Sequence, residues 1–323
     1  MRRRFVVGEA DHGLTLSDVI ARVGGDASAI SDGRVFVRSH RISDPAHRLS
    51  VGDDVSVADS ESNRVAAEVV SLGHSAGFVA FAKPPGLPTI PDHRGNASLL
   101  HAAAAYLGVS PSELHVLTRL DVNVSGVVLL ALGREATRRA VLLQSSGGVV
   151  RRYVGLSAGV PEPPCGVWTD PVGARVSGRG RLRRPVRDAA TRYAVRSIVS
   201  GKSDRSRTAL LVFEPVTGRT HQIRIHSSAG GAPLLGDVAY GGPKRLVAEN
   251  GSVLDVARVS LHAARVDVVL GSEASLSFEA KPPEDLVSLW TRLGGTRADF
   301  DTATSPLELD AARAAWKVRP NGL

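Results

Sequence analysis

Asp121 lies in a short segment whose residues suit catalysis by a carboxylate. Residues 118–126 read TRLDVNVSG, which places an acid two residues after an arginine and shortly before an apolar run. An Arg-x-Asp pair alone is usually a surface salt bridge. Here, however, Ser125 and Gly126 allow close backbone approach, and residues 127–130 are all Val or Leu. This run reads as a buried strand or the start of a helix, and a loop anchored by it in the core is what holds a catalytic carboxylate in position.

A second polar segment, residues 217–226, reads TGRTHQIRIH. Its alternation predicts a strand, with Arg224 and His226 on one face and Ile223 and Ile225 on the other. His221 and His226 are not at a metal-ligand spacing supported by carboxylates or cysteines. Hydrogen-bonding roles for both histidines are therefore favoured over metal ligation, and we predict no metal site.

The elements that must position these segments are mostly strands. Strands are expected at 149–157, 192–198, 208–214 and 261–269, and helices at 102–107 and 286–293. Few helices intervene, and the usual Gly-rich phosphate loops are absent from the sequence. The predicted class is α+β, with a largely antiparallel mixed β-sheet domain over residues 63–295, flanked by helices and loops. Residues 296–323 form a charged tail, with a short helix expected near 307–316.

Residues 1–62 read as a small separate α/β module. Helical spacing from Leu16 to Val23 is followed by a short helix from Ile30 to Gly33, an alternating strand at 34–38, and a turn with a final strand at 51–57. This order resembles the small RNA-binding fold of a small-subunit ribosomal protein and of the tail of tyrosyl-tRNA synthetases. The resemblance implies an RNA-binding surface, against the alternative of an ordinary solvated charged face, and its expected residues are Arg34, Arg38, Arg41 and Arg48.

The composition favours a polyanionic partner and a reducing compartment. The net charge is +8, the sequence pI is about 10.2, and lysine occurs at only five positions, so arginine dominates. Arginine suits phosphate and base recognition. Cys165 is the single cysteine, which excludes an intramolecular disulfide. No apolar run is long enough to span a membrane. We expect a cytoplasmic protein without a membrane partner.

Taken together, the two polar segments closely resemble motifs of the RluA-type family of RNA pseudouridine synthases. That family carries Arg-Leu-Asp before Ser-Gly, and the Thr-Gly-Arg-Thr-His-Gln-Ile-Arg-x-His motif, which this chain matches in full. Three further features occur in the family's order between residues 75 and 285: Lys83-Pro84-Pro85-Gly86-Leu87, Tyr153 after Arg151-Arg152, and Gly236-Asp237-Val238-Ala239-Tyr240-Gly241 with Leu261-His262-Ala263.

The resemblance implies a role for each matching residue. Asp121 would be the catalytic carboxylate, and Arg224 would pair with it and keep it ionised. Tyr153 would stack on the uracil and could take the proton from carbon 5. An enzyme that acts on a base must take the base out of its stack. Further substrate contacts are implied for Arg119, which would hold the flipped nucleotide, for Ile223, which would wall the pocket, and for Arg219 and His221.

The implied reaction detaches uracil from ribose, turns it and rejoins it through carbon 5, with no cofactor. Asp121 could attack the anomeric carbon, attack the ring or act as a base, and the sequence does not choose among these. The family often has His where this chain has Thr118, and Thr where it has Val124. The expected partner is structured RNA, ribosomal or transfer, bound by a monomer. The alternatives are a non-catalytic RNA-binding protein or chaperone on the same fold, and a hydrolase using Asp121 with His221 or His226.

Overall fold

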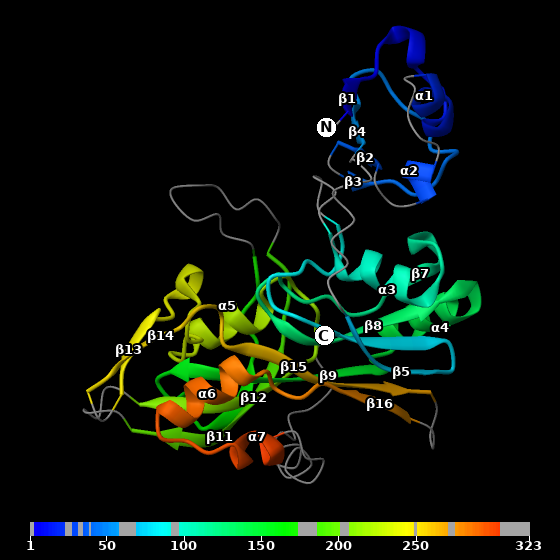
Figure 1. The fold of residues 1–323 in the computed structure, drawn as a ribbon. Coiled ribbons are helices and arrows are strands. Elements are labelled where there is room, and N and C mark those ends of the chain that lie inside the picture. The colour runs from blue at the N-terminus through cyan, green and yellow to red at the C-terminus, as the bar shows by residue number, and fades with distance from the viewer. Residues whose placement is uncertain are drawn as a thin grey trace. The chain divides into compact units, whose positions relative to one another are not determined.

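The computed structural model divides the chain into two compact units, and Figure 1 shows its elements. Unit 1 comprises Met1–Val122 and Val128–Leu142, and unit 2 comprises Asn123–Val127 and Leu143–Leu323. The structure describes residues 3–22, 28–31, 35–38, 40–57, 69–91, 97–173, 186–200, 207–248, 251–270 and 275–303. Each unit is described by itself below.

The amino-terminal part of unit 1 is a four-stranded antiparallel sheet with short helices. Its strand order is β1-β4-β2-β3, and apolar side chains from the helices and strands form one buried cluster, which includes Leu16, Ile20 and Val55. The predicted helix, short helix and strands are confirmed. The elements are β1 (Arg3–Val6), η1 (Glu9–Asp11), α1 (Leu16–Arg22), α2 (Ser28–Ser31), β2 (Val35–Val37), β3 (His40–Arg41) and β4 (Asp54–Val57).

The remainder of unit 1 contains the strand that follows Asp121. β5 pairs with β6, and β7 pairs with β8, both antiparallel. Val127 to Ala131 in β8 are completely buried, as the apolar run predicted. The elements are β5 (Val70–Ser75), β6 (Phe78–Lys83), α3 (Leu99–Leu107), η3 (Pro111–Glu113), β7 (Leu114–Val116), β8 (Ser125–Leu132) and α4 (Gly133–Ser145).

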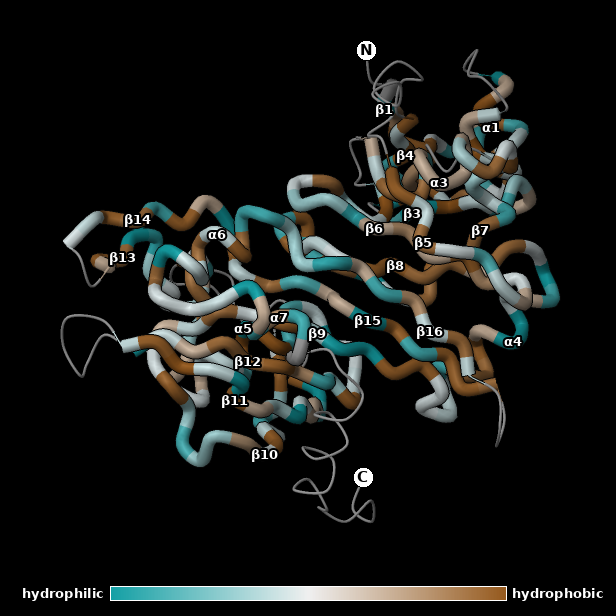
Figure 2. Tube along the Cα trace, turned by 60° about the horizontal axis from the view of Figure 1, so that its bottom comes forward, coloured by the Kyte–Doolittle hydropathy of each residue, from teal (hydrophilic) through white to brown (hydrophobic). Residues whose placement is uncertain are grey.

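Unit 2 is built on a mainly antiparallel sheet in the order β10-β11-β12-β9-β15, with β16 on the far side of β15. β15 also pairs in parallel with the first residues of β8, His262 opposite Ser125 and Ala263 opposite Gly126. Figure 2 shows brown, hydrophobic residues along β12, every residue of which is buried. The strands are β9 (Val149–Ala158), β10 (Cys165–Trp168), β11 (Thr191–Val199), β12 (Thr208–Pro215), β15 (Leu261–Val269) and β16 (Ser275–Glu279).

Helices α6 and α7 cover one face of this sheet. Trp290 of α6 and Phe300 of α7 pack in one cluster with Val154 of β9 and Val212 of β12, and Figure 1 shows both helices beside β11 and β12. The remaining elements of unit 2 are α5 (Gln222–Ala229), η4 (Val238–Tyr240), β13 (Arg245–Val247), β14 (Val253–Asp255), α6 (Glu284–Arg292) and α7 (Ala298–Ala303).

The predicted α+β class and its mainly antiparallel mixed sheet are confirmed. All four strands expected in the later chain are present, α3 contains the first expected helix, and α6 corresponds to the second but ends at Arg292, one residue earlier than expected. The helix expected at 307–316 and the linker after residue 57 lie outside the described residues. Among the described helices, none is both long and apolar enough to cross a membrane.

Candidate active site

The loop that carries Asp121 is anchored by alternate residues. Leu120 and Val124 are buried, at 7% and 2% exposure, whereas Arg119 is exposed and Asp121 is half-buried. The two apolar side chains therefore anchor the loop, while Arg119 is exposed and the Asp121 carboxylate is partly accessible. This is the arrangement that the sequence predicted for a positioned acid.

Two side chains, one from the last residue of β6 and one from the segment after it, bind the backbone on either side of Asp121. Lys83 is buried at 1% exposure, and its Nζ donates to the carbonyls of Pro84, Leu87 and Val122 at 3.0, 2.7 and 3.0 Å. The hydroxyl of Thr89 donates to the Leu120 carbonyl at 2.9 Å and accepts from the Leu120 N–H at 3.0 Å. The residues before and after the acid are thus both fixed by hydrogen bonds.

The two departures from the family pattern are both buried, Thr118 in unit 1 and Val124 in unit 2. Thr118 is 2% exposed, and its hydroxyl accepts from the Leu129 N–H at 2.8 Å. Val124 is 2% exposed. Thr118 therefore ties the start of the Asp121 loop to β8, and Val124 fills an apolar position. Both residues contribute to the loop's support.

In unit 2, Tyr153 lies in the middle of β9, where it faces Phe213 of β12 and Ala263 of β15 in register. Its side chain is 7% exposed. The pairing with β15 shifts between Ala263 and Arg265, opposite Tyr153 and Arg152. A bulge of this kind bends a strand and re-aims side chains, and such irregularities are common beside active sites.

The start of β8 packs directly on β15 at this bulge. Gly126 has a φ of +121°, and a Cβ there would lie 2.2 Å from the carbonyl oxygen of Ala263, so only glycine fits. Beside it, the Ser125 hydroxyl lies 2.9 Å from Nδ1 of His262, and Nε2 of His262 lies 2.9 Å from the Ala280 carbonyl. The Ser-Gly pair of the motif is thereby fixed to β15.

The prediction of a strand over residues 222–226 is wrong, because these residues begin helix α5. Gln222, Ile223, His226 and Ser227 are its buried residues, which is helical spacing. His221 precedes the helix in the left-handed conformation, at φ +58°. A short alternating run does not by itself distinguish a strand from a buried helix.

The Gln222 side chain organises the turn before α5. Its Oε1 accepts from the Thr217 hydroxyl at 2.7 Å and from the Arg219 N–H at 3.0 Å, while its Nε2 donates to the Ala190 carbonyl and the Thr191 hydroxyl. Arg151 of β9 supports the same turn by donating to the Thr217 carbonyl at 3.1 Å. The Thr-Gly-Arg-Thr sequence is therefore a turn fixed by two side chains.

Arg224 forms a bidentate ion pair with Asp237. Nε and Nη2 each donate at 2.7 Å to one carboxylate oxygen, and the Asp237 side chain is only 1% exposed. The Arg224 guanidinium also lies over the ring of Tyr240, 5.0 Å from its centre. The Tyr240 hydroxyl is 2.9 Å from Nδ1 of His221. Unit 2 thus brings Arg224 and His221 together around Tyr240.

The other predicted substrate residues also have defined positions. Ile223 is buried at 6% exposure, and Arg219 donates through Nε to the Asp188 carbonyl at 3.0 Å. Buried His226 binds the Thr191 hydroxyl and the Asp170 carbonyl, and burial lowers its pKa. Among the described residues, no group of three or more His, Cys, Asp or Glu side chains could hold a metal ion.

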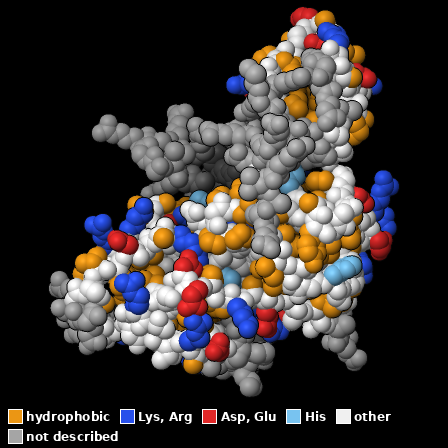
Figure 3. All heavy atoms as spheres, in the orientation of Figure 1, with side chains coloured by type: hydrophobic (Ala, Val, Ile, Leu, Met, Phe, Trp, Pro, Cys, Tyr) orange, Lys and Arg blue, Asp and Glu red, His pale blue; other side chains and the backbone are white. Residues whose placement is uncertain are grey.

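The arginines predicted to bind RNA in the amino-terminal module have different environments. Arg38 is exposed and pairs with Asp53, and Arg48 is exposed and donates to the Gly13 carbonyl at 2.7 Å. Arg41 is half-buried, and burial lowers its pKa. Arg34 lies outside the described residues. On the face drawn in Figure 3, basic and acidic side chains are interspersed over the lower part of the molecule.

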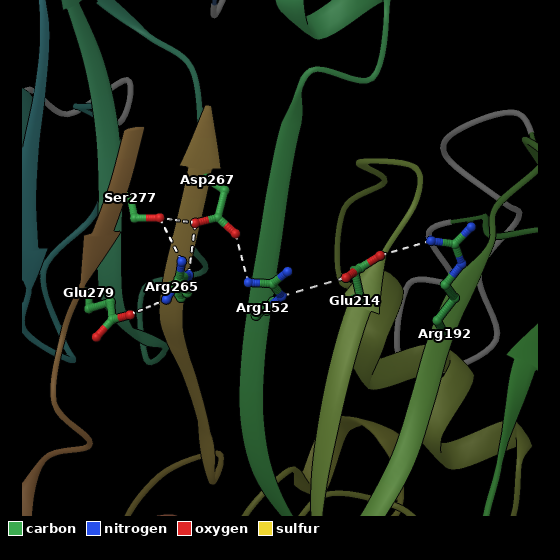
Figure 4. Close-up of polar contacts among 7 residues, drawn as sticks. All are labelled: Arg152, Arg192, Glu214, Arg265, Asp267, Ser277 and Glu279. Carbon is green, nitrogen blue, oxygen red and sulfur yellow. Dashed lines mark hydrogen bonds and ion pairs between the residues drawn. The ribbon is translucent and has the colours of Figure 1, made fainter. Parts of the chain in front are cut away.

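A row of ion pairs crosses the sheet beside Tyr153 (Figure 4). Arg152 is 5% exposed; it donates to Asp267 at 2.7 Å and lies 3.7 Å from Glu214. Because successive residues of a strand point to opposite faces, this row lies on the face away from Tyr153. Its other contacts link Glu214 to Arg192, Asp267 to Arg265 and Ser277, and Arg265 to Glu279. We call these residues the Arg152 row.

Sequence reasoning missed several of these residues. Thr89 and Arg192 belong to no motif quoted above, and no role was assigned to Lys83, Asp237, Tyr240 or His262 although their motifs were recognised. The run from Lys83 to Thr89 did carry a signal, because Pro and Gly mark a loop directly after a buried strand. Its bonds to Leu120 and Val122 join residues more than thirty positions apart.

Comparisons with known proteins agree with these observations. A model of the RNA pseudouridylate synthase family matches residues 77–229. An uncharacterized RNA pseudouridine synthase of Zymomonas mobilis is 33% identical over 213 residues, covering 64% of this chain and 90% of that protein. The chloroplastic RNA pseudouridine synthase 2 of Oryza sativa is 30% identical over 211 residues, but the match covers only 45% of its length.

The fold also matches solved structures. The human RNA pseudouridylate synthase domain containing 4 superposes with a TM-score of 0.55 at 25% identity, over 72% of this chain and 97% of that one. The fold similarity, the ordered motifs, the anchored Asp121 loop and the Zymomonas relative all point to the same family. The chain therefore belongs to the RNA pseudouridine synthase family.

Proposed function

We propose that the chain isomerises specific uridines in ribosomal or transfer RNA, with Asp121 as its catalytic carboxylate. The observation behind this assignment is that hydrogen bonds hold the backbone on both sides of Asp121. Leu120 and Val122, on either side of the acid, are hydrogen-bonded by Thr89 and Lys83, while Asp121 itself stays half-buried. Such support is expected of a reacting group that must be held in one geometry. The enzyme acts as a cytoplasmic monomer and needs no cofactor.

The roles proposed for unit 2 follow from its chemistry. Tyr153 stacks on the uracil and accepts the proton from carbon 5, since an aromatic ring can bind any base by stacking. Arg224 is the cation that pairs with Asp121, and Ile223 is the apolar wall of the base pocket. The bidentate pair with Asp237 fixes the guanidinium in one orientation, and Asp121 would share this cation with Asp237. Arg119, Arg219 and His221 hold the flipped nucleotide and its backbone.

The amino-terminal module is proposed to be an RNA-binding arm like that of a small-subunit ribosomal protein. Its support is the order of helices and strands, together with Arg38 and Arg48 at exposed positions. Arg38 already pairs with Asp53, and Arg48 already donates to the Gly13 carbonyl. Contacts of these two arginines with phosphate must therefore replace those bonds or add to them. The contribution of the arm is therefore to affinity, and the chemistry stays with Asp121.

The experiment that tests this function replaces Asp121 by Asn and measures release of tritium from carbon 5 of labelled uridine RNA. Asn has the size of the carboxylate but is neither a useful nucleophile nor a base. A catalytic group of this kind contributes a factor of ~10² or more, so we expect no detectable release from a folded protein that still binds RNA.

Two results would contradict the proposal in different ways. A folded Asp121→Asn protein that releases tritium at a substantial rate would remove Asp121 from the mechanism. A wild-type protein that binds cellular RNA but releases no tritium from any of it would instead indicate a non-catalytic binder. Thermal melting of both proteins is the folding control, and comparing pseudouridine maps of total RNA from a deletion strain and its parent identifies the target.

A further inference from the structure

Thr89 bonds to both backbone groups of the residue immediately before Asp121. Its hydroxyl accepts from the Leu120 N–H at 3.0 Å and donates to the Leu120 carbonyl at 2.9 Å. Thr89 is 4% exposed and Leu120 is 7% exposed, so water does not compete freely for these groups. The Thr89 hydroxyl therefore supplies the hydrogen bonds that a neighbouring strand would usually supply to the Leu120 N–H and carbonyl.

The two bonds require a side chain that donates and accepts at one atom. A hydroxyl carries one hydrogen and two lone pairs, so Thr and Ser meet this requirement and Val does not. Thr89→Val has nearly the same shape but would leave the buried N–H and C=O of Leu120 without these partners. A change at Thr89 thus acts on the backbone next to the acid while preserving the packing.

Thr89 is itself held by the start of α3. Its own carbonyl accepts from the Leu100 N–H at 3.1 Å, and the carbonyl of Pro88 accepts from the Leu99 N–H at 2.8 Å. The helix is capped by Ser98, whose side chain accepts from the His101 N–H. A continuous path of hydrogen bonds therefore runs from a capped helix through Thr89 to the Asp121 loop, all within unit 1.

We propose that Thr89 is a positioning residue for Asp121. It fixes the backbone directly before the carboxylate, whereas Lys83 bonds the carbonyl of Val122 directly after it. Loss of the Thr89 bonds would let the Leu120 backbone shift, and the Asp121 carboxylate, which extends from the next residue, would shift with it. This inference rests on the proposed function, because it assigns the bonds to placing a reacting group.

The test compares Thr89→Val with Thr89→Ser by tritium release from labelled RNA. Misplacement of a reacting group by ~1 Å can lower a rate ~100-fold, so Thr89→Val should lower kcat by roughly 10- to 100-fold while KM stays near the wild-type value. Thr89→Ser should restore kcat, because it returns the hydroxyl. Thr137→Val is the matched control, since it removes a threonine hydroxyl that donates to the Gly133 carbonyl within α4 of the same unit, and it should keep wild-type kcat.

Hydrogen exchange gives a second readout that does not depend on turnover. The Leu120 amide should exchange faster in Thr89→Val, while the Leu129 amide, which is held by Thr118, should keep its protection. If the Val variant does not fold, Thr89→Cys replaces it, because a thiol is only a weak donor and acceptor. Unchanged kcat in a folded Val or Cys variant, or failure of Ser to restore a lost kcat, overturns the inference.

The failure of this inference differs from failure of the proposed function. Inactive Asp121→Asn together with fully active Thr89→Val removes only the role of Thr89. An active Asp121→Asn removes the catalytic role of Asp121 and, with it, the reason for positioning it. A fall in affinity for RNA without a fall in kcat would show that Thr89 supports binding and would also overturn the positioning role.

Discussion

Buried His262 should make the stability of unit 2 depend on pH. Its ring is 2% exposed and bridges the Ser125 hydroxyl and the Ala280 carbonyl, both at 2.9 Å. Because the carbonyl can only accept, Nε2 carries the hydrogen, and Nδ1 accepts from Ser125. Burial, opposed by the bond to Ala280, lowers the pKa of His262 from 6.5 to about 4. The folded protein therefore holds this imidazole neutral.

The sign and the size of the effect follow from proton linkage. Between the folded pKa of about 4 and the unfolded value of 6.5, the unfolded chain binds more protons, so stability is full above the unfolded pKa and is lost as the pH falls. For these two values, the loss from about pH 7.5 to about pH 5 is ~2 kcal/mol. At lower pH it approaches a limit of ~3.4 kcal/mol, at ~1.4 kcal/mol for each pH unit between the two pKa values.

The assay is urea unfolding at both pH values for the wild type and for His262→Gln, whose amide can still donate and accept but does not titrate. We expect the wild type to lose ~2 kcal/mol more than the variant on acidification, since all other titrating groups are shared. His74→Gln, which removes an exposed histidine of β5, is the control and should behave like the wild type. An equal loss of stability in the wild type and in His262→Gln would refute the reasoning.

Three further changes, the last with a matched control, have expected outcomes. Tyr153→Phe should bind RNA nearly as the wild type does, because stacking is retained, but should release carbon-5 tritium slowly; wild-type release would remove the hydroxyl from the mechanism. A chain beginning near residue 64 should bind RNA more weakly and with a shallower salt dependence, and unchanged affinity and slope would show that the module is not an RNA-binding arm. Arg152→Ala should lower the free energy of unfolding by up to ~3–5 kcal/mol, because Glu214 and Asp267 lose a shared buried cation, while Arg192 and Arg265 still pair with them. Arg245→Ala breaks an exposed pair and should cost under about 1 kcal/mol; chemical denaturation of both variants checks the difference.

The strands of the catalytic region could be predicted because their apolar runs are long. β8, β9, β12 and β15 are each eight to ten residues long and largely buried, so their hydrophobic pattern indicates them directly. α5 could not be assigned in the same way, because only Ile223 to His226 carried the alternating pattern and four residues fit either period. Helix α5 follows a turn that the Gln222 side chain stabilises. That side chain bonds Thr191 of β11 and Ala190 directly before β11, contacts that the local pattern does not show.

The contacts of the candidate site could be predicted from the sequence only in part. Motif order identified Asp121, Tyr153 and Arg224, yet the bidentate partner of Arg224 was not foreseen, because Asp237 is thirteen residues away in a separate loop. The hydroxyl of Thr89 reaches Leu120 across thirty-one positions. Long-range bonds of this kind leave no periodic signal in a sequence. For the same reason, the pairing of Arg38 with Asp53 could not be read from its charge.

The Arg152 row also has a consequence for how β9 finds its partners. A shift of β9 by one residue against β12 and β15 would exchange the two faces of the strand. Arg152 would then leave Glu214 and Asp267, and the ring of Tyr153 would stand between two buried carboxylates. Such a mispaired sheet would keep much of its apolar area but would bury unpaired charge, which costs several kcal/mol. The row therefore selects one alignment of β9 as the sheet assembles, and that alignment turns the Tyr153 ring to the opposite face.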